Sequence, residues 1–331
     1  MKKQLSLHIG RWALVLMLLV MLISYLVASW VEQEIFAPER RPLYSFHLER
    51  VNNPAEFGLR LREHYCIGGK VSCVLVEPDA IAGPGRRGKV LREQLVERGV
   101  AIRPYGEVQG TIVMLHGRNG RKESLLAVAE RFVAAGFRCL IMDLPAHGQS
   151  KVGRLSFGSS EFERQLPAQV LLEMREAFGL PKQPVFLWGM SMGGSFALST
   201  ARNDNSWAGI IVVSSFARLD ELLANYIQPQ HRHFAGVLLK ALDITRDFQG
   251  KPIVSAINPE RWATKVSVPA LVVHGDRDYY VPMEHGQRMF NALPGDDKQW
   301  LVVPGGGHRG VLSTPMQLYA AMSEWMLART N

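Results

Sequence analysis

The sequence predicts an α/β fold, in which a mostly parallel sheet is covered by helices on both faces and one transmembrane helix precedes the sheet. Two observations predict it. From residue 110 onward, short apolar runs alternate with stretches that carry apolar residues at helical spacing. Strands that are apolar throughout are typical of parallel sheets buried on both faces. The start of the chain differs, because it carries one long uncharged apolar run.

That run, residues 12–31, reads WALVLMLLVMLISYLVASWV. A helix of this length spans roughly 30 Å, the thickness of bilayer hydrocarbon. Lys2, Lys3 and Arg11 precede it, so the positive-inside rule keeps the N-terminus in the cytoplasm and places the rest on the outer side. The alternative is a cleaved signal peptide and a secreted protein, with cleavage near residues 27–29. The length of the run favours an uncleaved anchor.

The expected organisation has three parts. Residues 1–31 form a cytoplasmic tip and the anchor, residues 32–54 a polar linker, and residues 55–331 one α/β domain. The expected strands after an initial hairpin (57–78) are 110–117, 137–144, 184–189, 208–215, 270–275 and 299–304, and helices stand between them. Residues 216–262 interrupt the alternation with a mostly helical pattern, and we expect them to form a cap over the sheet edge.

Composition excludes several classes of partner. The chain has 331 residues and a formal net charge of +8, but no block of five or more Lys and Arg and no nucleic-acid motif, so no nucleic-acid partner is expected. No His, Asp and Cys cluster has metal-ligand spacing, and no glycine-rich phosphate loop follows a first strand. We therefore expect no metal and no cofactor. Oligomeric state cannot be read from the sequence.

Three cysteines are present. Cys66 and Cys73 flank a turn built on Gly68 and Gly69, and the sequence leaves open whether they pair. A two-residue turn on the glycines would set Cys66 opposite Val71. Cys139 lies in an apolar strand and is interpreted as a core residue.

The stretch FLWGMSMGGSFAL, residues 186–198, contains the pattern G-x-S-x-G between a strand and a helix. In that context the pattern predicts a nucleophile elbow, a tight turn that presents Ser191 at the carboxyl edge of the sheet. Gly189 and Gly193 are needed there because a Cβ at either position would meet the neighbouring strand or helix. The serine itself should have a strained backbone conformation.

A serine hydroxyl needs a base, and the base needs an orienting acid. The order for such a fold is serine, acid, histidine. Asp276 and Asp278 follow the strand 270–275, and His308 follows the last strand. The carboxyl ends of parallel strands meet at one edge, so we expect these side chains to converge on Ser191.

Taken together, the motifs LHGRNG, DLPAHGQS, GMSMGG, HGDRDYYVP and GGGH resemble the α/β-hydrolase fold family over residues 55–330. The pattern is similar to membrane-anchored Bem46-like serine hydrolases, to lysophospholipase-type relatives and to serine aminopeptidase S33-like members. The resemblance implies that Asp278 is the acid and Asp276 a turn residue. It also implies that the backbone N–H groups of Arg118 and Met192 form the oxyanion hole. The second motif departs from the commoner pattern by having Ala146 in place of glycine.

The expected function is hydrolysis of a carboxylic ester through an acyl-enzyme, with Ser191 as nucleophile, His308 as base and Asp278 as orienting acid. The anchor and the apolar cap suggest a lipid-like acyl ester, with contact to the membrane through residues 12–31. A serine peptidase or an acyltransferase would use the same three residues. A membrane-tethered binding module that has lost turnover is the non-enzymatic alternative.

Overall fold

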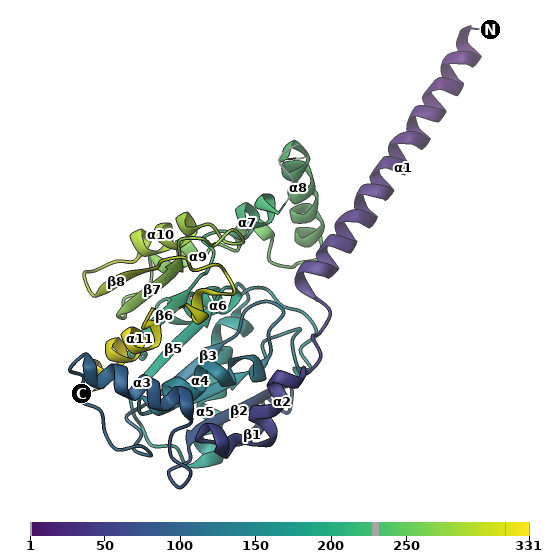
Figure 1. Ribbon diagram of the computed structural model, residues 1–331. Coiled ribbons are helices and arrows are strands. Elements are labelled where there is room, and N and C mark those ends of the chain that lie inside the picture. The colour runs from purple at the N-terminus through teal and green to yellow at the C-terminus, as the bar shows by residue number, and fades with distance from the viewer. Residues whose placement is uncertain (1, 227–231, 315, 331) are drawn as a thin grey trace.

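The computed structural model describes residues 2–226, 232–314 and 316–330, and its centre is an eight-stranded sheet in the order β1-β2-β4-β3-β5-β6-β7-β8 (Figure 1). The strands are β1 (Leu59–Cys66), β2 (Val71–Pro78), β3 (Gly110–Leu115), β4 (Phe137–Met142), β5 (Val185–Met190), β6 (Gly209–Val213), β7 (Ala270–Gly275) and β8 (Lys298–Val303). The pairs β1–β2 and β2–β4 are antiparallel, and the pairs from β4 through β8 are parallel. The expected mostly parallel sheet is confirmed.

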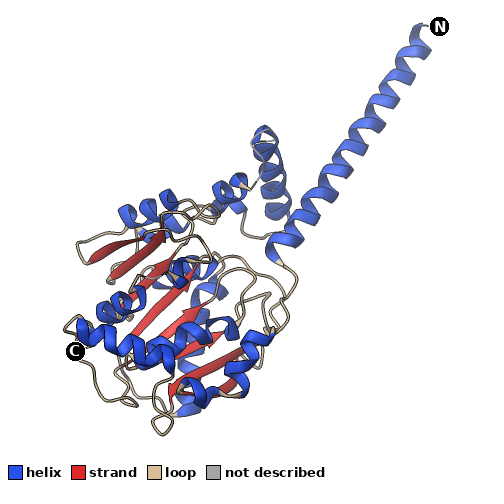
Figure 2. Ribbon diagram, in the orientation of Figure 1, coloured by secondary structure: helices blue, strands red, loops and turns tan. Residues whose placement is uncertain are grey.

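Helices cover both faces of the sheet (Figure 2). The structure has helices α2 (Ser45–Asn52), α3 (Arg86–Glu97), α4 (Leu126–Ala134), α5 (Glu161–Phe178), α6 (Met192–Ala201), α7 (Leu219–Asn225), α8 (Arg232–Phe248), α9 (Pro259–Ala263), α10 (Met283–Ala292) and α11 (Leu318–Leu327). Helices α3, α4 and α11 pack on one face, and α5, α6, α9 and α10 on the other. The alternation of strand and helix predicted from residue 110 onward is therefore present.

Strand β5 shows why these short runs fold as buried strands. Val185 and Leu187 pack into the apolar cluster that contains α5 and α6. Phe186 and Trp188 point to the opposite face and pack with α4 and α11. Successive strand residues point to opposite faces, so a strand covered on both sides must be apolar at every position.

The first hairpin leaves its cysteines as free thiols. Cys66 pairs with Val71 in the register of β1 and β2, as expected, and Cys73 pairs with His64. Both thiols are buried, and the hydrogen bond with Cys66, together with burial, raises the pKa of the Cys73 thiol. Cys139 is buried in β4, which confirms its interpretation as a core residue.

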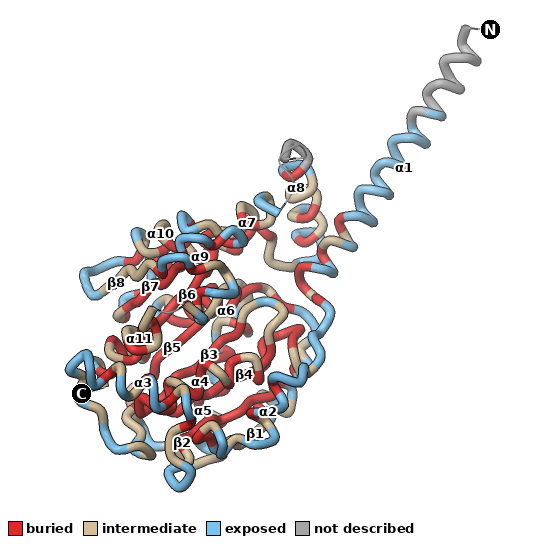
Figure 3. Tube along the Cα trace, viewed as in Figure 1, coloured by how far each residue is buried: buried red, intermediate tan, exposed pale blue. Residues whose placement is uncertain are grey.

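The N-terminal helix α1 (Lys2–Phe36) continues beyond the boundary expected at residue 31. Its segment Leu14–Phe36 is long and apolar enough to cross a bilayer. Figure 3 shows that α1 projects from the domain with an exposed surface and becomes buried only near its end. Residues 32–54, expected as a linker, therefore begin with the last helical turns and include α2.

The expected cap, residues 216–262, contains α7, α8, the short helix Val254–Ala256 and α9. Residues 227–231 of this segment lie outside the described residues. Helix α8 packs beside the end of α1 (Figure 1). The cap and the apolar N-terminal helix thus meet at one side of the domain.

Candidate active site

Ser191 lies at the turn between β5 and α6, with φ 54° and ψ −119°. A positive φ is strained for a residue with a Cβ and costs about 1–3 kcal/mol, so the surrounding contacts must hold it. They include a hydrogen bond from the Ser191 N–H to the Val213 carbonyl, 2.8 Å, and one from the Ser215 hydroxyl to the Ser191 carbonyl, 2.7 Å. The expected backbone strain is present.

The two elbow glycines leave no space for a side chain. A Cβ on Gly189 would overlap the carbonyl of Gly193, and a Cβ on Gly193 would overlap the carbonyl of Leu115 at the end of β3. The close approach of strand, turn and helix therefore explains the glycine at each of the two positions.

His308 lies between the nucleophile candidate and a carboxylate. Its Nε2 atom is 3.0 Å from Oγ of Ser191, and its Nδ1 atom is 2.8 Å from Oδ2 of Asp278. The other carboxylate oxygen of Asp278 accepts the backbone N–H groups of Tyr280 and Val281, at 3.0 and 2.8 Å. These bonds fix a buried carboxylate against one edge of the imidazole. The structure thus brings the three predicted side chains together.

Asp276 has a different place. Its side chain is exposed at the surface, and its Oδ1 accepts the N–H of Gly305 at 2.7 Å. Gly305 follows β8 and precedes the loop with His308, so Asp276 ties the loop after β7 to the loop after β8. This geometry matches a turn-forming role and leaves Asp278 as the carboxylate beside the histidine.

The loop after β3 lies against the elbow. A Cβ on Gly117 would be 3.4 Å from Cβ of Ser191, and the next residue, Arg118, lines the same cavity as Ser191. Met192 is the first residue of α6, and its N–H has no intrahelical acceptor. Both residues predicted to supply oxyanion N–H groups therefore border Ser191, and both line the cavity beside it.

Two histidines hold the loop after β3 in place. The Nε2 of His116 accepts the Leu144 N–H at 3.1 Å, and the Nε2 of His147 accepts the Asn119 N–H at 3.3 Å. Burial lowers the pKa of His116 to about 4 and that of His147 to about 3, so both rings are neutral at pH 7. The interpretation of these residues as structural rather than catalytic fits their contacts.

Ala146 lies in the same loop system and has φ 64°. A glycine adopts this conformation without a steric penalty, whereas alanine pays about 1 kcal/mol. The departure from the commoner motif therefore leaves the backbone conformation intact at a small cost in stability.

An apolar cavity of about 190 Å³ opens at Ser191. Its walls include Phe157, Phe216 and Leu222 from the domain and the cap. The same cavity is lined by Ile35, which belongs to the last turn of the apolar N-terminal helix. The sequence pattern predicts that residue 35 lies in a polar linker, which does not account for this contribution. The signal was the apolar pair at positions 35 and 36 directly after the acidic residues.

The end of α1 is fastened to the domain by charge as well as packing. Glu32 is buried and accepts from Arg246 of α8 at 2.8 Å, and it also pairs with Arg154 and Lys251. The guanidinium of Arg246 lies 3.4 Å from the ring centroid of Phe36. The wall that Ile35 provides is thus held by contacts on both sides.

A second, charged cavity of about 480 Å³ lies on the other side of Arg118. Glu34, Glu39, Arg40 and Arg41 line it together with Arg118. Within the described part of the chain, none of these five side chains forms an ion pair. Arg118 therefore lines both the apolar and the charged cavity.

Comparisons with known proteins identify proteins of similar sequence and fold. Residues 106–258 match the family model described as serine aminopeptidase, S33. A quorum-quenching protein, AidA, from Acinetobacter baumannii is 36% identical over 111 residues, which cover 33% of this chain and 36% of that protein. A thermostable monoacylglycerol lipase from a Bacillus species is 22% identical over 203 residues, 57% of this chain and 78% of the lipase.

Among solved structures, a membrane phospholipase A described as a bacterial virulence factor superposes with a TM-score of 0.53 at 16% identity. The superposition covers 97% of this chain and 99% of that structure, and at this identity it shows a shared fold. The sheet order, the elbow and these matches lead to one assignment. The chain has the α/β-hydrolase fold, and its sequence is similar to serine hydrolases of the esterase and lipase type.

Proposed function

We propose that the protein hydrolyses a carboxylic ester through an acyl-enzyme formed on Ser191. The observation that supports it best is the chain of hydrogen-bond distances from Ser191 through His308 to Asp278, 3.0 and 2.8 Å. His308 takes the hydroxyl proton as Ser191 attacks the ester carbonyl, and it then returns that proton to the leaving alcohol. Asp278 holds the imidazole in the tautomer that has Nε2 free and stabilises its protonated form.

The oxyanion of the tetrahedral intermediate is assigned to the N–H groups of Arg118 and Met192. Each such donor contributes about 10²- to 10³-fold to the rate. Since these are backbone groups, Arg118→Ala should cost much less in kcat than Ser191→Ala.

The proposed substrate is a lipid ester with one acyl chain and a polar head. The apolar cavity of about 190 Å³ suits the acyl chain and is smaller than typical drug-sized sites. The charged cavity beyond Arg118 suits a polar head on the other side of the ester bond. Two relatives, the monoacylglycerol lipase and the membrane phospholipase A, carry names of enzymes that act on such lipids.

The test uses the full chain in a non-ionic detergent. A fluorophosphonate probe should label the protein at Ser191, and the protein should hydrolyse a short activated ester. Ser191→Ala should abolish both signals, whereas Ser206→Ala, an exposed serine outside the site, should keep them. Equal turnover of the ester by the parent protein and Ser191→Ala would refute the nucleophile assignment.

Substrate profiling separates the alternatives. The matched family model is named for a serine aminopeptidase, so peptide amides belong in the same assay as monoacylglycerols and lysophospholipids. Faster cleavage of a peptide amide would favour the peptidase, and acyl transfer to an added alcohol in place of water would favour an acyltransferase. A protein that binds lipid but is not labelled by the probe would be a binding module.

The apolar helix α1 is proposed as an uncleaved anchor with the catalytic domain on the outer side of the membrane. Burial of Ala28, Glu32 and Ile35 against the domain supports retention of the helix after export. A C-terminal alkaline phosphatase fusion should be active and the mature protein should keep residue 2 by mass spectrometry. A mature chain that begins near residue 30 would support the secreted alternative.

A further inference from the structure

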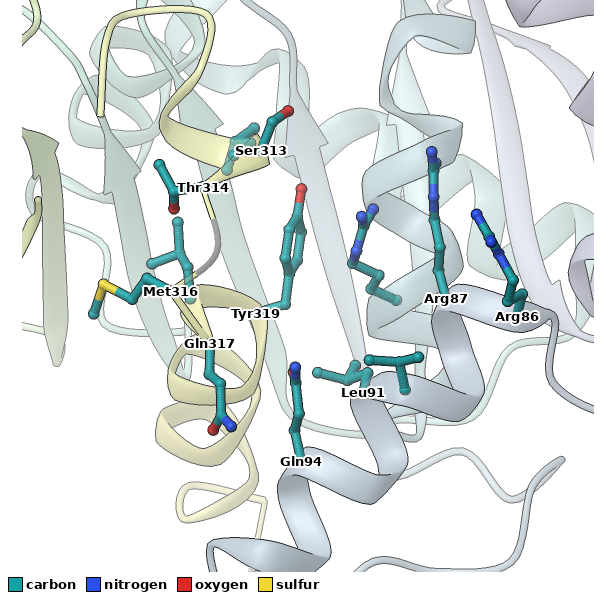
Figure 4. A pocket seen from close by; sticks show the side chains of 13 residues that line it. Arg86, Arg87, Leu91, Gln94, Ser313, Thr314, Met316, Gln317 and Tyr319 are labelled. Carbon is teal, nitrogen blue, oxygen red and sulfur yellow. The ribbon is translucent and has the colours of Figure 1, made fainter. Parts of the chain in front are cut away.

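A basic pocket of about 310 Å³ lies between α3, α4 and the segment that leads into α11. It is remote from the apolar cavity at Ser191, with which it shares no lining residue. Figure 4 shows Tyr319 standing between the helix that carries Arg86 and Arg87 and the segment that carries Ser313 and Thr314. The pocket therefore has arginines on one wall and hydroxyl groups on the other.

The positive charge in this pocket is poorly compensated. Arg86, Arg87 and Arg131 line it, and among the described residues no carboxylate does. Glu130 pairs with Arg87 at 3.9 Å and is already held by two N–H groups of Arg50, at 3.1 and 2.9 Å. Burial and repulsion by the positive charges of Arg50 and Arg131 lower the pKa of Arg87.

Contacts with uncharged groups hold the guanidinium of Arg131 in place. Arg131 lies 4.3 Å from the ring centroid of Tyr319 and donates to the Ala127 carbonyl at 2.6 Å. Leu91, which is buried, and Met316 add apolar surface beside the arginines. A pocket with this lining suits an organic anion whose charged end contacts several guanidinium groups, rather than a cation or a purely apolar ligand.

We propose that this pocket binds a soluble phosphomonoester, with its phosphoryl group against Arg86, Arg87 and Arg131. Three guanidinium groups match the three terminal oxygens of a phosphate, to which arginine donates paired N–H bonds. The hydroxyl groups of Ser313 and Tyr319 supply further donors, and the organic part of the ligand covers Leu91. A membrane lipid is less suited, because α3 and α11 lie on the side of the domain away from α1 (Figure 1).

The site adjoins the loop that bears His308. Ser313 ends the short helix Val311–Ser313, and the Val311 N–H donates to the Gly307 carbonyl at 2.7 Å. A ligand that bridges α3 and Ser313 therefore ties the His308 loop to the opposite wall of the pocket. Binding should raise the melting temperature of the protein even without any substrate.

The test is isothermal titration calorimetry on the full chain in a non-ionic detergent at constant ionic strength. Phenyl phosphate should bind saturably and more tightly than inorganic phosphate, because its ring covers the apolar surface. The double variant Arg86→Gln/Arg87→Gln should weaken binding about tenfold or more, since it removes two charge-assisted donors from the phosphoryl group. Arg261→Gln, which removes one charge from an exposed arginine in α9 as Arg86→Gln does in α3, should leave affinity unchanged.

Further measurements distinguish a loss of binding from misfolding, and a phosphomonoester from a lipid ligand. Arg86 is exposed and has no ion pair in the described residues, so Arg86→Gln should fold normally and still weaken binding. Arg87→Lys keeps the charge but loses the paired N–H geometry, and an intermediate affinity is expected. Absence of saturable phenyl phosphate binding, unchanged affinity in the double variant, or tighter binding of dihexanoyl phosphatidylglycerol would each overturn the proposal.

Discussion

The Nε2 atom of His308 lies 3.0 Å from Oγ of Ser191, although 117 positions separate the two residues in the chain. Each residue follows a strand of the same parallel sheet, so their convergence is a consequence of the fold. The imidazole is in turn in contact with Asp278, and the neighbouring Asp276 faces away toward Gly305. This arrangement allows the two aspartates to be tested against each other.

Asp278→Asn should lower kcat by about 10³- to 10⁴-fold, because the amide stabilises the wrong tautomer of His308. Asp276→Asn should lower kcat less than about tenfold, since an asparagine oxygen still accepts the Gly305 N–H. Initial rates with a short activated ester measure both variants. Similar losses in the two variants would contradict the separate roles given to these residues.

Gly193→Ala should prevent formation of the elbow. Its Cβ would overlap the Leu115 carbonyl, and backbone on both sides leaves little room for relaxation. We expect a protein that fails to fold or loses fluorophosphonate labelling. Gly153→Ala is the matched control, because a Cβ there meets nothing within 4 Å and its φ is not positive. That variant should change the free energy of unfolding by no more than about 0.5 kcal/mol.

Glu32→Gln should loosen the end of α1 from the cap. It leaves the buried guanidinium of Arg246 without its carboxylate, at a cost of about 3–5 kcal/mol. Arg154 also pairs with Glu32 but its side chain is 42% exposed, so Arg154→Gln should cost only about 1 kcal/mol. Urea denaturation of the full chain in a non-ionic detergent compares the two. An equal loss of free energy of unfolding in the two variants would mean that the contact with α8 does not hold the end of α1.

Ile35 should influence acyl-chain preference, because it lines the cavity at Ser191 from the N-terminal helix. Ile35→Ala should shift the highest kcat/KM to longer acyl chains, and Ile35→Phe to shorter ones. The measurement is a series of p-nitrophenyl esters from acetate to dodecanoate. Val237→Ala, an exposed substitution on α8, should leave the series unchanged. An identical acyl-chain profile in all variants would show that the acyl chain does not contact the N-terminal helix.

Acid should destabilise the protein through its buried neutral histidines. The pKa of His116 is lowered to about 4 by burial, whereas an unfolded histidine titrates near 6.5. Between these values the unfolded chain binds more protons than the folded one, so stability is full above pH 6.5 and falls as the pH drops toward 4. The free energy of unfolding should therefore depend less on pH in His116→Asn than in the parent protein.

The comparison must be made as a difference between variants, because Glu163 acts in the opposite direction. Burial raises the pKa of Glu163 to about 7, so its contribution to stability falls as the pH rises from about 4.5 to 7. The contribution of Glu163 is the same in both proteins. It is removed when the free energy of unfolding of the parent protein is subtracted from that of His116→Asn at each pH. A pH dependence in His116→Asn as steep as in the parent protein would contradict a neutral buried ring.

The sequence by itself determined the strands, the helices and the elbow. Each of these depends on a local pattern: apolar runs such as residues 184–189 predict buried strands, and the spacing of Gly189, Ser191 and Gly193 predicts the tight turn. The order of serine, acid and histidine further predicted which loops meet. These inferences succeed because periodicity and the steric size of glycine act within a few residues.

Only the tertiary structure decided what the N-terminal helix contributes to the site. Glu32 meets Arg246 across 214 positions, and Ile35 forms a wall of the cavity at Ser191. The apolar pair at positions 35 and 36 signals burial of this part of the chain, but it does not indicate the partners, because these depend on how the cap helix packs against α1. The free thiols of Cys66 and Cys73 were likewise decided by the packing of the hairpin in three dimensions.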